Sequence, residues 1–275
     1  PVSTIIDTSS QITKDNLKTR IPLPVNKDEL YVLSQNINNL LDRVENAIER
    51  EKQFTSDASH ELRTPLAVMK GTMEVLIRKP RDQKEYEEKI NFCITEVDRL
   101  NHMVDQLLLL ARFENQKQNI KNETIYLNAI ILDNLTRFSS KIENKKLKVN
   151  TEFSEDFYIQ SDNYLVSIVI SNLISNAIKY SNKNGKININ LVNNNNQISF
   201  SIAYKGIGIS PVDIDKIFNS FYRSDVTNHA EIKGTGLGLS IVKRLCDLLK
   251  LEIAVESKLN HGTTFILSFP LAKLK

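Results

Sequence analysis

A glycine-rich segment in this sequence has the spacing of a phosphate-binding loop. In residues 234–239 three glycines alternate with Thr235 and Leu237, and a helical pattern follows directly. Glycine lets the backbone approach a ligand closely, and the free N–H groups at a helix N-terminus attract anions. The segment therefore predicts a backbone cradle for phosphate.

A second group of polar residues shares one face of a predicted helix. Asn172, Asn176 and Lys179 follow one another at intervals of four and three residues, which brings them to the same side of a helix. Hard oxygen ligands suit magnesium, which keeps several waters and binds substrate phosphates. For any one of these residues, the polar face of a surface helix is also a plausible explanation, but it explains the whole string from Asn172 to Tyr180 poorly.

Gly206 and Gly208 form a third candidate, since they would let the backbone approach a ligand closely. A simple turn explains the same letters. A dinucleotide-binding reading of the glycines fails, because no βαβ unit with a downstream acidic residue surrounds them.

His60 is the candidate nucleophile. It lies two residues from both Ala58 and Leu62, and two residues span about 200° of a helix, so it points away from the apolar stripe into solvent. Imidazole is a good nucleophile near neutral pH because its ordinary pKa is about 6.5. A neighbouring carboxylate can hold the proton on the other ring nitrogen. Taken alone, an exposed helical histidine is more often an ordinary surface residue.

The helix that carries His60 is one arm of a predicted helical hairpin in residues 49–115, interrupted at residues 79–82. Two helices cannot bury both of their apolar stripes alone, so the pattern predicts a homodimer with a four-helix bundle. The first stripe is Phe54, Ala58, Leu62, Leu66, Met69, Met73 and Leu76, and the second is Ile90, Ile94, Val97, Leu100, Val104, Leu107 and Ala111.

The segments on either side of the hairpin differ in their predicted secondary structure. Residues 1–48 contain a short helical pattern, a proline-marked connector at 20–24 and a second helix with 3–4 apolar spacing, which fits either a coiled-coil seam or a plain amphipathic helix. In residues 123–275, alternating runs at 186–192 and 197–203 predict a hairpin, and 251–256 and 263–269 predict two more strands. We expect a compact α+β domain there.

Composition excludes several classes. A formal net charge of +3 over 275 residues is too small to argue for nucleic-acid binding. Two distant cysteines, Cys93 and Cys246, make a disulfide framework unexpected. No apolar run approaches the roughly 18 residues that a membrane span needs. Because the chain begins at Pro1 without Met, we expect a fragment of a longer protein.

Residues 54–66, which include His60-Glu61-Leu62-Arg63-Thr64-Pro65, closely resemble the phosphoacceptor motif of sensor histidine kinases. The resemblance implies that His60 accepts phosphate and that Glu61 holds the ring proton. It also implies that Thr64, which is one turn from His60, orients the water that dephosphorylates the partner. Pro65 removes a helical hydrogen bond and is expected to bend the helix there.

The C-terminal region resembles the ATP-binding domain of the same kinases, a Bergerat-type two-layer α+β fold shared with type II topoisomerase, heat-shock-90 and mismatch-repair ATPases. By resemblance, Asn176 holds magnesium, Lys179 faces phosphate and Arg223 reaches the terminal phosphate, while residues 224–233 form a lid. The implied ATP-binding residues are Asn172, Asn176, Lys179, Tyr180, Tyr204, Gly206, Gly208, Tyr222, Arg223, Gly234, Thr235, Gly236, Leu237 and Gly238.

Tyr204 departs from this resemblance. The family normally has Asp at this position, and its carboxylate accepts a hydrogen bond from the adenine amino group. A phenol cannot supply a charged acceptor at neutral pH, and its ring is much larger. This substitution predicts weakened ATP binding.

Residues 1–48 resemble a HAMP signalling domain, through Arg20-Ile21-Pro22, Asp28-Glu29-Leu30 and Asn38. The whole resemblance implies three domains, at 1–48 (HAMP), 49–117 (dimerisation and phosphoacceptor hairpin) and 123–275 (catalytic ATP-binding). It also implies a preceding transmembrane helix, so that this chain is the cytoplasmic part of a protein of the bacterial inner membrane.

Three functions remain open. The first is a kinase that phosphorylates His60 with ATP and magnesium, passes the phosphoryl group to an Asp of a response regulator and dephosphorylates that regulator. The second is a kinase-impaired variant that acts as a phosphatase or conformational relay, which Tyr204 supports. The third, an ATPase that clamps a partner, needs no phosphoacceptor, so the His60 motif argues against it.

Overall fold

The computed structural model describes residues 2–13, 16–115, 120–194, 197–224 and 234–270. The chain divides into two compact units, residues 1–67 and 68–275. Among the described residues, no helix combines the length and apolar composition that crossing a membrane requires.

Helices α1 (Val2–Gln11) and α2 (Glu29–Ile77) lie on either side of the proline-marked connector, as the sequence predicts. Asp28 marks the start of α2, because its carboxylate accepts hydrogen bonds from the backbone N–H groups of Leu30 and Tyr31, at 3.1 and 3.2 Å. The helix continues without a break past residue 48 and contains Pro65.

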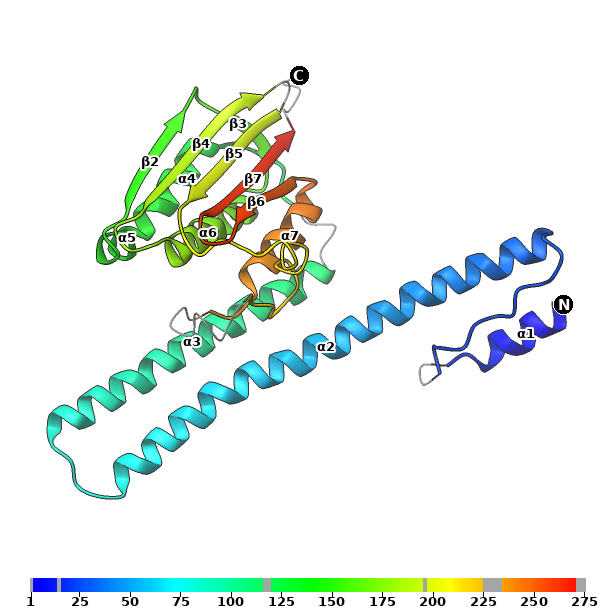
Figure 1. Ribbon diagram of the computed structural model, residues 1–275, viewed down its shortest axis with the longest axis horizontal. Coiled ribbons are helices and arrows are strands. Elements are labelled where there is room, and N and C mark those ends of the chain that lie inside the picture. Colours follow the sequence, from blue (N-terminus) through cyan, green and yellow to red (C-terminus); the bar gives the residue numbers. More distant parts are fainter. Residues whose placement is uncertain (1, 14–15, 116–119, 195–196, 225–233, 271–275) are drawn as a thin grey trace. The chain divides into compact units, whose positions relative to one another are not determined.

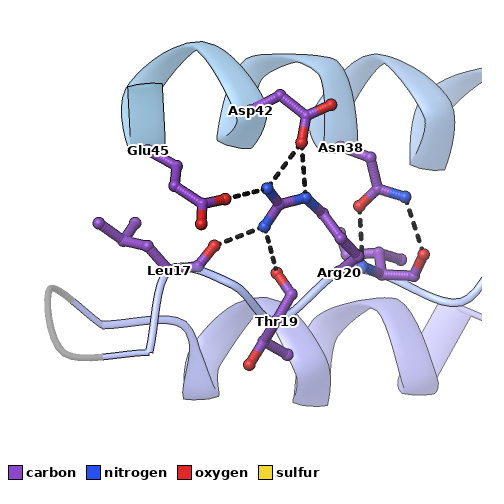
Figure 2. Close-up of polar contacts among 7 residues, drawn as sticks. Leu17, Thr19, Arg20, Asn38, Asp42 and Glu45 are labelled. Carbon is purple, nitrogen blue, oxygen red and sulfur yellow. Dashed lines mark hydrogen bonds and ion pairs between the residues drawn. The ribbon is translucent and has the colours of Figure 1, made fainter. Parts of the chain in front are cut away.

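The connector is held to α2 by side chains from both segments (Figure 2). The Arg20 guanidinium forms ion pairs with Asp42, at 2.6 Å, and with Glu45. It also donates hydrogen bonds to the backbone carbonyls of Leu17, at 2.5 Å, and Thr19, at 3.1 Å. These contacts satisfy carbonyls of an irregular segment that has no regular backbone pairing of its own.

Asn38 adds a second attachment, because its amide pairs with both backbone groups of Ile21. The Ile21 N–H donates to Asn38 Oδ1 at 2.8 Å, and Asn38 Nδ2 donates to the Ile21 carbonyl at 2.9 Å. The Ile21 side chain is 1% exposed, so this pair of hydrogen bonds fixes a buried point of the connector.

We expect Asn38→Ala to lower the free energy of unfolding of this region by about 1–3 kcal/mol, because it leaves two backbone groups of Ile21 unpaired. Hydrogen exchange at the Ile21 amide should accelerate accordingly. The matched control is Asn39→Ala, since Asn39 is exposed on the same helix. Equal protection of the Ile21 amide in both variants would contradict the assigned role of Asn38.

In the second unit, the end of α2 from Val68 and helix α3 (Gln83–Asn115) surround the predicted break at residues 79–82. Met69 and Cys93 are buried, whereas predicted stripe residues such as Met73, Ile90 and Ile94 are about half exposed, at 54%, 52% and 52%. Together with Leu76, Ile77 and Val97 they line an apolar groove of about 430 Å³.

The remaining elements form the α+β domain (Figure 1). A five-stranded sheet has the order β2-β4-β5-β7-β6, in which β2 pairs with β4 in parallel and the other pairs are antiparallel. A separate antiparallel pair joins β1 and β3. The strands are β1 (Glu123–Tyr126), β2 (Lys148–Phe153), β3 (Tyr158–Ser161), β4 (Lys186–Asn194), β5 (Gln197–Tyr204), β6 (Glu252–Lys258) and β7 (Gly262–Pro270), and the helices are α4 (Leu127–Arg137), α5 (Ser139–Asn144), α6 (Asn163–Tyr180) and α7 (Gly238–Leu249).

The core of this domain lies between the sheet and α4, α6 and α7, with α6 packed against both other helices. Burial alternates along β4, β5 and β7, so every second side chain faces the helices. Leu173, Ile174 and Ala177 of α6 are fully or almost fully buried, at 0%, 1% and 0% exposed. The opposite face of α6 is thereby left to carry the predicted polar residues.

Candidate functional site

A cleft of about 800 Å³ opens on the polar face of α6. It brings together ten of the fourteen residues that the sequence assigned to ATP binding, from α6, from residues 222–223 and from the glycine-rich segment. Those ten are Asn172, Asn176, Lys179, Tyr180, Tyr222, Arg223, Gly234, Thr235, Gly236 and Gly238. Residues as far apart in sequence as Asn172 and Gly238 therefore meet at one site.

The glycine-rich segment lies directly against α6. A Cβ atom on Gly234 would lie 1.9 Å from the Lys179 ammonium nitrogen, and one on Gly238 would lie 2.8 Å from Asn172 Oδ1. Glycine at these two places leaves room for the ends of the Lys179 and Asn172 side chains directly against the backbone. Gly238 begins α7, so the free N–H groups of that helix start lie beside Asn172, and the preceding Gly234 lies beside Lys179, as expected for an anion-binding site.

Asn172 is oriented by its own helix. Its Nδ2 donates to the Ile168 carbonyl at 2.9 Å, which leaves its Oδ1 toward the start of α7. Asn176, one turn further along the same face, lines the cleft. The predicted shared face of α6 is therefore correct.

The cleft is strongly cationic. Its lining includes Arg99, Lys141, Lys145, Lys179, Lys183 and Arg223, and no Asp or Glu side chain among the described residues. Sequence reasoning missed four of these cations, because they lie outside the motifs. Lys145 donates to the Ile178 and Lys179 carbonyls at 2.9 and 2.7 Å, so it also neutralises the C-terminal end of α6.

Lys179 has the most perturbed charge in the cleft. Burial, together with repulsion from Arg223 and Arg99, lowers its pKa from 10.5 to about 8. Its ammonium lies 4.9 Å from the centroid of the Tyr180 ring. A half-buried cation that has no carboxylate beside it among the described residues is stabilised by a bound anion, and this is the ligand that the cleft favours.

The lowered pKa of Lys179 predicts that the affinity of the cleft for phosphate depends on pH. Phosphate bound beside Lys179 favours its charged form, so ligand binding takes up a proton wherever the free lysine is neutral. Affinity for a phosphate ligand should therefore be constant below pH 8 and fall above it, by up to about tenfold per pH unit. Calorimetry between pH 7 and 9.5 measures this slope. Lys179→Arg, which stays charged, should remove it, and an unchanged slope in that variant would contradict the assignment.

A smaller cavity of about 60 Å³ adjoins the cleft and is lined by Tyr204, Gly208, Tyr180 and Asn176. Gly208 has φ +66°, and a Cβ there would lie 2.1 Å from the Lys258 carbonyl. This glycine is thus needed both for its backbone conformation and for close packing.

Tyr204 is the last residue of β5 and is 7% exposed. Burial raises the pKa of its phenol, while a hydrogen bond with Thr263 opposes that rise. Thr263 Oγ1 also lies 2.8 Å from Ser257 Oγ, which accepts a hydrogen bond from the Ile209 N–H at 2.8 Å. Tyr204 is therefore a neutral, packed side chain anchored at the wall of the smaller cavity.

Two predicted residues do not line either cavity. Gly206 pairs with Ser181 in an isolated bridge, and Leu237 is fully buried at 0% exposed, immediately before α7. Both support the site through the backbone. Of the predicted lid at 224–233, residues 225–233 lie outside the described residues.

His60, Glu61 and Thr64 belong to the first unit, on α2. His60 is exposed, as its position relative to the apolar stripe predicts, and Glu61 is half-buried. The Thr64 hydroxyl donates to the His60 carbonyl at 3.0 Å. This bond leaves the acceptor lone pairs of the Thr64 oxygen available for a water molecule.

Three family models match successive parts of the chain. Residues 1–46 match the HAMP domain, residues 50–116 the His Kinase A (phospho-acceptor) domain, and residues 161–273 the histidine kinase-, DNA gyrase B-, and HSP90-like ATPase. Their order agrees with the order of the resemblances in the sequence.

Known proteins agree with these matches. The signal transduction histidine-protein kinase ArlS of Staphylococcus aureus strain USA300 is 31% identical over 98% of this chain, which spans 60% of that relative. The Acinetobacter baumannii histidine kinase AdeS is 25% identical with a TM-score of 0.63, over 78% of this chain and 98% of that one. Histidine kinase ThkA, solved in complex with the response regulator protein TrrA, is 23% identical with a TM-score of 0.67, over 84% and 66%. The order of the three domains and the ArlS relative establish that the chain belongs to the sensor histidine kinases of two-component systems.

Proposed function

We propose that this chain uses ATP to phosphorylate His60 and then passes the phosphoryl group to an aspartate of a response regulator. The observation that carries the proposal is the cationic cleft, in which Lys179, Asn172 and the glycine-rich segment converge. Such a cleft suits a nucleoside triphosphate, while the exposed His60 on α2 supplies a nucleophile.

The cleft chemistry also fits a magnesium ion that arrives with the nucleotide. Asn172 and Asn176 offer amide oxygens, and in the absence of cleft carboxylates among the described residues, phosphates and water would complete the coordination. Magnesium would reduce the negative charge of the phosphates. We propose Asn176 as its protein ligand, with Lys179 and Arg223 contacting phosphate and Tyr180 contacting the nucleoside.

The phosphoryl transfer requires one free nitrogen on His60. That nitrogen attacks the terminal phosphorus, a nitrogen–phosphorus bond forms, and the bond to the bridging oxygen breaks as ADP leaves. We assign Glu61 to hold the proton on the other ring nitrogen. The phosphoryl group then moves from nitrogen to a carboxylate oxygen of the response regulator, and the imidazole is regenerated.

We further propose that the chain removes phosphate from the regulator. Thr64 lies one turn from His60 on an exposed face, with its hydroxyl oriented by the His60 carbonyl. Its oxygen is suited to position a water for attack on the phosphoaspartate.

Tyr204 favours a second candidate function, in which the chain acts mainly as a phosphatase or conformational relay. The phenol occupies the wall of a cavity of only about 60 Å³, so little space remains there for an adenine ring. In that function the His60 and Thr64 chemistry toward the regulator persists, while ATP use is weak.

Incubating the chain with ATP and then with a receiver domain tests the two functions. The first predicts label on the chain followed by label on the receiver. The second predicts loss of label from a chemically phosphorylated receiver, with little labelling of the chain. If ATP labelled neither the chain nor the receiver domain, and the phosphorylated receiver kept its label, both functions would be wrong.

We also propose that the chain acts as a homodimer through a four-helix bundle. The exposed apolar residues around the groove, including Ile90, Ile94 and Val97, need a partner helix that one chain does not supply. Light scattering at micromolar concentration should give twice the 31.4 kDa chain mass.

The interface can be tested by single substitutions. We expect Ile94→Glu to shift the mass toward the monomer, because it places a charge on the apolar groove. Leu132→Glu is the matched control, since Leu132 is a similarly exposed apolar residue, at 47%, on α4. A chain that is monomeric before any substitution would contradict the bundle.

The HAMP match and the ArlS relative support a further proposal on location. The chain spans 60% of the length of ArlS, and we propose that it is the cytoplasmic part of a sensor anchored in the bacterial cell membrane. The domain boundaries 1–48, 49–117 and 123–275 stay predictions.

A further inference from the structure

Helix α3 contributes side chains to the wall of the nucleotide cleft. Arg99, His102 and Gln106 line it from outside the ATP-binding motifs, together with α6 and the glycine-rich segment. These residues are spaced by three and four positions, so they form one face of α3. The site is therefore incomplete when the α+β domain is considered alone.

Gln106 makes a direct contact with the glycine-rich segment. Its side chain is largely buried, at 9% exposed, and its Oε1 accepts a hydrogen bond from the Thr235 hydroxyl at 2.8 Å. The Thr235 oxygen in turn accepts from the Leu237 N–H at 3.3 Å. A short chain of hydrogen bonds thus joins α3 to the start of α7, where phosphate is expected to bind.

Arg99 brings a cation to the same cleft. Its guanidinium pairs with the buried Glu96 carboxylate at 3.3 Å, while its Nε is buried and has no hydrogen-bond partner among the residues that the structure describes. Burial is the largest cause of the lowered pKa of Lys179, and the charges of Arg223 and Arg99 lower it further. Without a ligand, this face of α3 therefore adds repulsion to a site that is already cationic.

A polyphosphate would reverse this balance, because its negative charges attract all three cations at once. A phosphate that contacts both Arg99 and the cleft binds most tightly when α3 lies against the cleft. By linkage, its binding therefore stabilises the contact between α3 and the cleft.

We propose that Arg99 is a phosphate-binding residue supplied by the phosphoacceptor hairpin, and that Gln106 is a positioning residue that holds the glycine-rich segment for it. The inference rests on the proposed ATP binding. It adds that nucleotide phosphates, and not the nucleoside, draw α3 and the ATP-binding domain together.

Calorimetry with ATP, ADP and adenosine tests the inference, in the parent chain and in the Tyr204→Asp background. We expect Arg99→Ala to weaken ATP binding by about 10- to 100-fold, the range of a charge-assisted hydrogen bond, and to leave adenosine binding unchanged. Retained adenosine binding also shows that the domain is folded. Arg99→Lys should recover part of the loss, because it keeps the charge. The matched control is Arg112→Ala, an exposed arginine on the same helix that does not line the cleft.

Gln106→Leu provides an independent measurement. It keeps the side-chain size and removes the acceptor for Thr235, so we expect faster hydrogen exchange at the Leu237 amide in the ATP-bound chain. The inference is overturned if Arg99→Ala binds ATP as tightly as its parent, or loses ATP and adenosine equally. If no parent chain binds ATP, including the one with Tyr204→Asp, the proposed function fails and the inference fails with it.

Discussion

Replacing His60 with glutamine should abolish labelling of the chain by ATP. Glutamine is polar and of similar size, but its amide nitrogen is not a nucleophile near neutral pH, so no nitrogen–phosphorus bond can form. Because His60 is exposed on α2, the substitution removes no core packing, and the helix content should not change. The expected loss is complete within the sensitivity of a radiolabel assay.

His261→Gln is the matched control, since His261 is an exposed histidine at the β6–β7 turn. It should leave labelling at the level of the parent chain. Labelling that survives in His60→Gln would show that His60 is not the nucleophile.

A second substitution on the same turn separates the two proposed activities. Thr64→Ala removes a hydroxyl that donates a hydrogen bond to the backbone carbonyl of His60 and not to its imidazole. The nucleophile therefore stays intact, and labelling should persist. Dephosphorylation of the regulator should slow. If Thr64→Ala abolished labelling and spared dephosphorylation, the assigned roles would be reversed.

Tyr204→Asp should strengthen ATP binding by about 10- to 100-fold. A carboxylate at the end of β5 would accept a charge-assisted hydrogen bond from the adenine amino group, worth about 1.5–3 kcal/mol in a desolvated pocket. The smaller side chain also enlarges the cavity that the phenol now narrows. Labelling of His60 should accelerate with the gain in affinity.

Tyr204→Phe is the control for this effect. It keeps the ring and removes the hydroxyl that bonds with Thr263, so it should not increase affinity. A circular dichroism melt would confirm that the new carboxylate leaves the domain folded. Equal, tight ATP binding by the parent, Tyr204→Asp and Tyr204→Phe would show that adenine is held without an acidic acceptor. It would also show that Tyr204 does not weaken ATP binding.

Local patterns were enough to predict most of the helical region and four of the five strands of the larger sheet. The long helices and the break at 79–82 follow from apolar periodicity and Pro80, and β4 and β5 follow from strict alternation. The strands β1, β2 and β3 were not predicted. β2 pairs in parallel with β4 through residues such as Val149 and Ile187, and this pairing depends on distant segments that a local pattern cannot identify.

In the candidate site, too, local spacing predicts some residues, while others reach the cleft only through tertiary packing. Asn172, Asn176 and Lys179 lie on one helix, so their common face could be predicted from spacing alone. Lys145 and Arg99 come from other elements and reach the cleft through tertiary packing. Neither has a local sequence signal that distinguishes it from an ordinary surface cation. Tyr204 was recognised through its departure from a family pattern, and its burial required the structure.

The central claim is that ATP phosphorylates this chain on His60. The most direct measurement is to incubate the chain, and its Tyr204→Asp variant, with magnesium and ATP labelled on the terminal phosphate, and then to map the label by mass spectrometry under neutral conditions. The account predicts one phosphoryl group on the peptide that contains His60, labile in acid and stable in base, with faster labelling in Tyr204→Asp. An acid-stable label on a serine, threonine or tyrosine, or no label on either chain, would contradict it.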